Sequence, residues 1–173
     1  KYWKKGDIFL SLRNQSMVIL YRPSTNEIIW TGTGYTFQQH DIGILDDHRI
    51  SIFNNNSKRF DGEYQVDGNS EVVIYDFEIN QYSKYLNNFL IENDFRTRSQ
   101  GQSKILENND LFVLDSEYGR LLYFKADGSL KWQYVNRAEN GNIYSVFWSR
   151  MLYKSIDIEK VQNLLTTNSC ISE

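Results

Sequence analysis

Alternating hydrophobic and polar positions recur in short segments along most of this chain, and three stretches can be laid over one another. The first copy, residues 6–32, reads GDIFLSLRNQSMVILYRPSTNEIIWTG, and the third, residues 109–136, reads NDLFVLDSEYGRLLYFKADGSLKWQYVN. Each passes through a strand, a polar turn, a second strand and a second turn, and ends on a third strand that carries Trp30 or Trp132. Period-two alternation between turn residues predicts β-strands, so the chain is expected to repeat one β unit.

A middle copy begins at His48 with the residues HRISIFNNN, carries an insertion over residues 59–70, and resumes as two further strands over residues 71–89. A leading strand at 42–45 precedes it, as 103–106 precedes the third copy, whereas the first copy lacks such a strand. Four short antiparallel strands per unit, at a period near ~45 residues, are typical of a β-propeller blade. We therefore expect an all-β fold of β-propeller-like repeats with about three blades. An irregular β-sandwich has the same alternation and remains the alternative.

Propellers typically close with about four to eight blades, so this chain is expected to form only part of a ring. We expect residues 1–141 to form the blades and residues 142–173 to form a capping segment and tail, in which 155–165 have the spacing of a short helix. The sequence starts at Lys1 without an initiator methionine, which indicates a piece of a longer protein. Upstream blades or another chain would then complete the ring.

Composition limits the partners. Of 173 residues, 40% are hydrophobic and 24% charged, as in ordinary globular proteins, and the aromatic share of 15% favours sheet surfaces. The net charge of -3 provides no basic surface for nucleic acid, and no apolar run reaches the roughly 18 residues of a membrane span. We expect no nucleic-acid partner and no membrane span. The single cysteine, Cys170, cannot form an internal disulfide and leaves the compartment open.

His40 and His48 are the only two histidines, so this chain alone cannot build a multi-histidine metal site, and we expect neither a metal nor another cofactor. His48 follows two aspartates in what is predicted to be an exposed hairpin tip. His40 comes just before the leading strand of its blade, which lines the channel of a propeller. Asp41 or a neighbouring glutamine is expected to set its tautomer and leave the other ring nitrogen free. The alternative is a half-buried histidine whose ring is satisfied by a carbonyl group.

Arg13 and Asn14 occupy the turn after the first strand of the first copy, which is the place that Asn54 and Asn55 hold in the second. Polar residues at a repeated turn can be explained by turn formation alone. If they cluster with His40 near the axis, the pairing of guanidinium and imidazole indicates a substrate with anionic oxygens, because arginine presents a planar fork to such oxygens.

Four blocks between Gly6 and Asn136 carry a more specific signal: GDIFLSLRNQSMVILY, QHDIGILDDHRISIFNNN, SEVVIYDFEI and GRLLYFKADGSLKWQYVN. Their most telling elements are the S-x-R-N-Q turn, the Q-H pair before a strand and the blade ending D-G-x-x-x-W. The blocks resemble the C-terminal half of proteins of the arylsulfate sulfotransferase family, which fold as six-bladed propellers. The resemblance implies ping-pong transfer of a sulfuryl group from a phenolic sulfate ester to a phenol, in a periplasmic or secreted protein.

The resemblance also implies residue roles. The histidine of the Q-H pair, the family's nucleophile, corresponds to His40, and the arginine that binds the sulfuryl oxygens corresponds to Arg13. The expected substrate-binding residues are Asn14, Gln39, Asn54, Tyr35 and Phe37. Two departures keep a second function open: the family's F-D-N-G turn reads F-N-N-N here, and its further active-site histidines lie on earlier blades. The alternative is a non-catalytic propeller that acts as a binding or assembly module.

Overall fold

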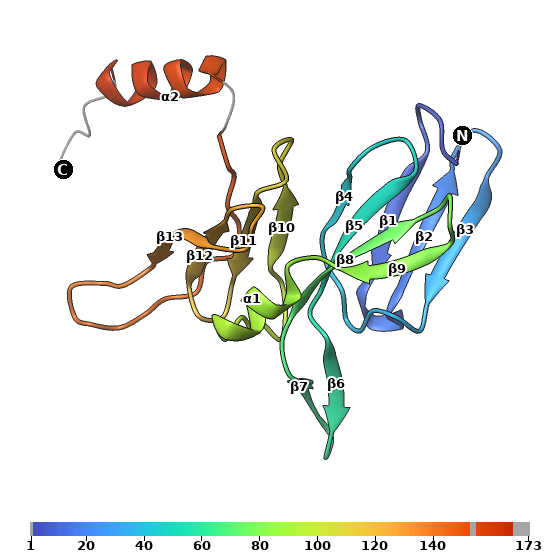
Figure 1. Cartoon of the computed structure of the whole chain (residues 1–173), viewed down its shortest axis with the longest axis horizontal. Coiled ribbons are helices and arrows are strands. Elements are labelled where there is room, and N and C mark those ends of the chain that lie inside the picture. The colour runs from blue at the N-terminus through green and yellow to red at the C-terminus, as the bar shows by residue number, and fades with distance from the viewer. Residues whose placement is uncertain (1, 153–154, 168–173) are drawn as a thin grey trace.

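The structure is a computed structural model that describes residues 2–152 and 155–167. The described residues form three larger antiparallel sheets and a separate two-stranded hairpin (Figure 1). The first sheet has the order β1 (Ile8–Leu12), β2 (Met17–Arg22), β3 (Glu27–Thr33). The second has the order β4 (Ile42–Ile44), β5 (Arg49–Asn54), β8 (Glu71–Asp76), β9 (Gln81–Lys84). The third has the order β10 (Gln102–Ile105), β11 (Leu111–Asp115), β12 (Arg120–Phe124), β13 (Leu130–Val135).

These sheets are the three predicted blades, and the all-β prediction is confirmed. The second and third are complete four-stranded units, whereas in the described residues the first has only three strands and β1 forms its edge. Ile8 and Leu10 of β1 are exposed, while Ile50 and Ile52 at the equivalent strand of the second blade are buried. Within the described residues the first blade therefore has no leading strand, as the sequence predicts.

The hydrophobic core lies between neighbouring blades. Residues of β5 alternate between its two faces, since side chains of successive strand residues point to opposite sides. Ile50 and Ile52 belong to a cluster with Val18 of the first blade, whereas Phe53 belongs to a cluster with Leu122 of the third. The middle blade is thus covered on both faces, which explains why its central strands read as almost continuous hydrophobic runs.

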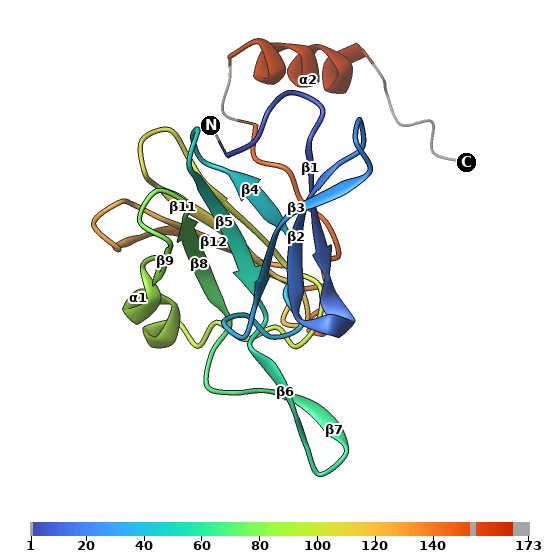
Figure 2. The same cartoon turned by 90° about the vertical axis from the view of Figure 1, so that its right-hand side faces the viewer.

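Two segments of the second blade depart from the strand pattern. The expected strand through Phe89 is wrong: β9 ends at Lys84, and residues Asn87–Glu92 form the helix α1, which buries Leu90 in the core. The insertion forms the hairpin of β6 (Ser57–Phe60) and β7 (Glu63–Val66), which projects away from the sheets (Figure 2). Its turn residues, Asp61 and Gly62, both have positive φ, as a two-residue hairpin turn requires.

The chain after β13 returns along the third blade. The Tyr144 N–H donates to Asn136 O at 2.9 Å, and the Val146 N–H donates to Ser116 O at 3.1 Å. The predicted short helix is α2 (Ser155–Thr167), and the tail expected beyond it lies outside the described residues. Among the described residues, no helix has the length and apolar character to cross a membrane.

Candidate functional site

His40 lies at the start of β4, and backbone pairing holds it there. Its N–H donates to Phe53 O at 2.9 Å, and the Phe53 N–H donates to Asp41 O at 2.9 Å, which extends the β4–β5 ladder beyond the strand ends. The His40 side chain is half-buried. Because Phe53 is fully buried in the core between blades, the backbone that carries His40 is anchored to that core.

Asn55, directly after β5, contacts the imidazole. His40 Nδ1 lies 2.6 Å from Asn55 Oδ1, and the Gln100 N–H points at His40 Nε2 at 3.3 Å. The Asn55 side chain is fully buried, and its Nδ2 donates to the carbonyl groups of Thr97 and Gln100, both at 2.8 Å. The imidazole is therefore held between the end of β5 and the loop that precedes β10.

The expectation that Asp41 or a neighbouring glutamine holds the imidazole is wrong. Asp41 accepts the Ser103 N–H at 3.1 Å and ties β4 to β10 instead, while burial raises the pKa of its carboxyl. Gln39 is fully buried and donates to Met17 O at 2.8 Å and to Ser11 Oγ at 3.3 Å. Successive residues of this segment alternate in direction, so Gln39 faces the first blade while His40 faces the loop before β10.

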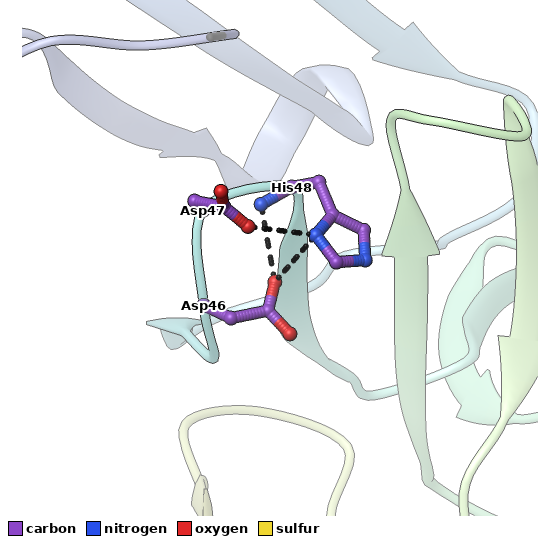
Figure 3. Close-up of side chains that lie close together, drawn as sticks. All are labelled: Asp46, Asp47 and His48. Atoms are coloured by element: carbon purple, nitrogen blue, oxygen red, sulfur yellow. Dashed lines mark hydrogen bonds and ion pairs between the residues drawn. The ribbon is translucent and has the colours of Figure 1, made fainter.

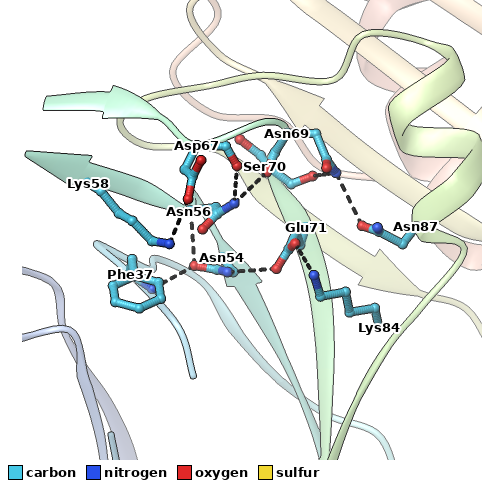
Figure 4. A network of polar contacts seen from close by, with 10 residues as sticks. All are labelled: Phe37, Asn54, Asn56, Lys58, Asp67, Asn69, Ser70, Glu71, Lys84 and Asn87. Carbon is cyan, nitrogen blue, oxygen red and sulfur yellow. Dashed lines mark hydrogen bonds and ion pairs between the residues drawn. The ribbon is translucent and has the colours of Figure 1, made fainter. Parts of the chain in front are cut away.

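The Asn54 side chain is also bonded to protein atoms at both ends of its amide. Its Oδ1 accepts the Phe37 N–H at 2.8 Å, and its Nδ2 donates to Glu71 Oε2 at 2.9 Å (Figure 4). Like Gln39, it is buried with its amide bonded to protein atoms. Both side chains therefore position the segment that leads into β4, and neither is exposed to contact a substrate.

Arg13 and Asn14 lie in a single 3-10 turn, Arg13–Gln15, at the end of β1. Arg13 Nη1 donates to Asn14 Oδ1 at 3.1 Å, and the guanidinium lies 5.9 Å from the ring centroid of Tyr64 in the hairpin. A cavity of about 340 Å³ is lined here by Arg13, Gly62, Glu63, Tyr64 and Arg98. His40 is not among its lining residues.

The turn after β1 nevertheless supports the histidine segment. The Gln38 N–H donates to Ser16 Oγ at 3.1 Å, and the Ser11 hydroxyl donates to Gln39 O at 3.0 Å. Ser11 precedes the 3-10 turn and Ser16 follows it, so residues on both sides of the turn bind the backbone just before His40. The turn that carries Arg13 is therefore hydrogen-bonded to the segment that leads to His40.

Tyr35 and Phe37 lie in a different cavity, of about 500 Å³, on the connection between β3 and β4. Lys58 Nζ lies 4.5 Å from the centroid of the Phe37 ring, and the Tyr35 ring stacks on Tyr82 with centroids 4.3 Å apart. Figure 4 shows the polar network beside it, in which Lys58 pairs with Asp67 at 2.7 Å. The seven predicted site residues therefore do not gather around His40. Arg13 lines one cavity and Tyr35 and Phe37 line another, while Gln39 and Asn54 are buried and bonded to protein atoms.

His48 lies at the hairpin tip between β4 and β5, at the other end of β4 from His40. Its Nδ1 lies 2.9 Å from Asp47 Oδ1 and 3.3 Å from Asp46 Oδ1 (Figure 3). The hydrogen bond with Asp47 raises the pKa of the His48 imidazole, and the nearby carboxylates of Asp46, Asp76 and Glu78 act in the same direction. The turn is as predicted, but the imidazole is half-buried among acids instead of freely exposed.

Comparison with known proteins agrees with the propeller architecture. The WD40 β-propeller domain of Doa1 is similar with a TM-score of 0.50 at 16% sequence identity, over 80% of this chain and 43% of that one. At this identity the likeness concerns the fold, and the chain spans less than half of the propeller that it matches. A search of curated proteins found no match.

A match to a family model identifies the family of this chain. The family model described as Arylsulfotransferase (ASST) matches residues 1–137, which include all three blades and both the Arg13 and His40 segments. Since the match covers well over half of the chain, this protein belongs to the arylsulfotransferase family.

Proposed function

We propose that this chain carries the sulfuryl-accepting histidine of an arylsulfotransferase. In the first step His40 Nε2 attacks the sulfur of a phenolic sulfate ester, an N–S bond forms, and the S–O bond to the phenol breaks so that phenolate leaves. In the second step the oxygen of an acceptor phenol attacks the same sulfur, an S–O bond forms while the N–S bond breaks, and the phenol proton passes to solvent or a base, which leaves the free imidazole. The observation that carries the proposal is the position of His40: its Nδ1 is engaged by Asn55, while among the described residues Nε2 has only the long contact with the Gln100 N–H.

Arg13 is proposed as the residue that binds the sulfuryl oxygens. Within the described residues its Nε is buried and has no hydrogen-bond partner, although its Nη1 contacts Asn14. A guanidinium that lines a cavity is suited to an anionic oxygen, which would be stabilised further as charge develops during transfer. Asn14 would then orient the guanidinium. For Tyr35 and Phe37, which line the cavity beside Lys58 and Glu71, we propose no contact with the group that His40 receives.

The ring around this site requires additional blades. The first blade has an unpaired edge at β1 within the described residues, and three blades form less than the usual ring. We propose that upstream residues or another chain supply the missing blades and the remaining side chains of the site. A periplasmic or secreted location, which the family resemblance implies, is part of the same proposal.

The test is intact-mass spectrometry of the full-length protein after brief incubation with 4-nitrophenyl sulfate. We expect a gain of about 80 Da, the mass of one sulfuryl group, that is discharged by added phenol and absent from His40→Ala. His48→Ala is the matched control, since it removes the other imidazole and should keep the adduct. An adduct that persists in His40→Ala would contradict the assignment.

One observation favours the second candidate, a non-catalytic binding or assembly module. The backbone N–H of Gln100 points at the nitrogen that would attack sulfur, so the lone pair is already engaged, although at a long 3.3 Å. Wild-type protein that forms no adduct and releases no nitrophenol would favour the module, and binding without turnover would then be its function.

A further inference from the structure

We infer that Asn55 is a positioning residue that sets the tautomer of His40, and that it is itself oriented by the backbone carbonyl groups of Thr97 and Gln100. The inference rests on the proposed function for its catalytic meaning, because the tautomer decides which ring nitrogen has a lone pair to attack sulfur. The geometry on which it depends comes from the hydrogen bonds of three segments that are far apart in the sequence: the end of β5, the start of β4 and the loop before β10.

The first step is the orientation of the Asn55 amide. The oxygen and nitrogen ends of an amide have nearly the same shape, so their neighbours must distinguish them. Asn55 Nδ2 lies 2.8 Å from Thr97 O and 2.8 Å from Gln100 O, and a carbonyl oxygen can only accept. The reversed amide would place its oxygen against both carbonyl oxygens and lose two buried hydrogen bonds. The amide nitrogen therefore faces the loop, and Oδ1 faces His40.

The second step transfers this orientation to the imidazole. Oδ1 of an amide is an acceptor only, so the nitrogen that lies 2.6 Å from it, His40 Nδ1, must carry the proton. In the neutral ring Nε2 then has the lone pair. The Gln100 N–H, which points at Nε2 at 3.3 Å, agrees independently, because the opposite tautomer would set two N–H groups against each other.

The carbonyl groups that orient Asn55 are themselves held in place. Thr97 is fully buried, its N–H donates to Ser70 Oγ at 2.9 Å, and its hydroxyl donates to Ser99 O at 3.0 Å. Ser70 Oγ also lies 3.1 Å from Thr97 O and 3.2 Å from Asn55 O. The loop and the turn after β5 therefore share one buried serine, whereas the carbonyl group of Gln100 orients the Asn55 amide without contacting that serine.

The experiment reads the tautomer directly. Long-range proton–nitrogen correlation spectra of ¹⁵N-histidine-labelled protein, recorded where the imidazole is neutral, distinguish pyrrole-type from pyridine-type ring nitrogens. In a His48→Gln background His40 is the single imidazole of this chain. We expect a pyrrole-type Nδ1 and a pyridine-type Nε2 for His40. In Asn55→Ala we expect a mixture of both tautomers, because the acceptor at Nδ1 is gone.

Ser70→Ala is the matched control. It removes hydrogen bonds from the same buried loop but leaves the contact between Asn55 and His40, so it should lower stability and keep the tautomer. A purely structural role for Asn55 predicts the same spectrum in both variants. If Asn55→Ala does not fold, the wild-type spectrum still decides, since a pyridine-type Nδ1 overturns the inference.

The inference and the proposed function fail separately. If the spectrum is as expected but no sulfuryl adduct forms, the proposed function fails and the tautomer assignment stands. If the adduct forms, Asn55→Ala should slow its formation by about tenfold, the equivalent of one lost hydrogen bond, while Ser70→Ala leaves the rate within about twofold. An Asn55→Ala variant with the wild-type tautomer and the wild-type rate would overturn the inference.

Discussion

Gly101 offers a quantitative test of how the site is packed against the core. It has φ +90°, a left-handed conformation that residues with a side chain adopt at a cost, and it lies between Gln100 and β10. A Cβ at this position would lie 2.5 Å from both Cε1 and Cζ of Phe53, and 3.0 Å from Cγ2 of Thr97. Phe53 is fully buried and packs edge-on against Phe95, with the two ring centroids 5.8 Å apart, so its ring has little room to move.

The expected cost of Gly101→Ala is the sum of two effects. The positive φ costs roughly 1 to 2 kcal/mol for a residue with a Cβ. Forcing the methyl group against the Phe53 ring adds roughly 1 to 3 kcal/mol, the range for overpacking a well-packed core. The free energy of unfolding should therefore fall by about 2 to 5 kcal/mol, a large share of the typical stability of a domain.

Gly34→Ala is the control, because Gly34 has φ +80° and a Cβ there would meet no atom within 4 Å. It should cost only the backbone effect, about 1 to 2 kcal/mol. Urea unfolding followed by tryptophan fluorescence measures both variants, and their difference isolates the contact with Phe53. Equal losses in the two variants would refute the argument, since they would mean that Phe53 yields to the added methyl group.

Three other changes test separate parts of the fold. Burial raises the pKa of Asp115 to about 6 although Arg120 contacts it, so between about pH 4 and pH 6 the folded protein keeps a proton that the unfolded chain has lost. Stability should fall by up to about 3 kcal/mol as the pH rises through this window, and urea titrations of Asp115→Asn should lack that fall. The hydrogen bond from Arg22 lowers the pKa of Asp7 to about 2, so Asp7→Asn should lower the melting temperature at neutral pH. The difference in melting temperature between this variant and the wild type should vanish as the pH falls from about 4 to about 2. Phe95→Ala should cost about 3 to 5 kcal/mol in urea unfolding, because the ring is fully buried between blades.

The repeated strands could be predicted from sequence because each is specified locally, by alternation and by the turn residues that bound it. The leading strand β10 and the incomplete first blade followed from the same comparison of copies. The segment that includes Phe89 could not be predicted in this way. Its helical state is associated with Leu90, whose side chain joins a core cluster with residues of the third blade, such as Leu122, and no local pattern records that contact.

The sequence predicts the position of His40 in the fold but not the residues that contact its imidazole. His40 was located by its position before β4, but its partner was assigned to sequence neighbours, and the structure gives Asn55 instead. The repeated polar turn contains both Asn54 and Asn55, but the sequence resemblance points to Asn54 alone as a candidate site residue. Adjacent residues point to opposite sides, so Asn54 reaches Glu71 and Asn55 reaches the imidazole.

Fold stability and site geometry depend on the same residue, Phe53. Its backbone forms hydrogen bonds with His40 and Asp41. Its ring fills the space beside Gly101, and the preceding residue, Gln100, points its N–H at His40 Nε2. A methyl group at Gly101 must therefore displace either the ring or the loop. If the loop moves, the carbonyl groups that orient the Asn55 amide move with it, and the tautomer of His40 should change together with stability. Gly34→Ala, whose added methyl group meets no atom within 4 Å, should change stability alone.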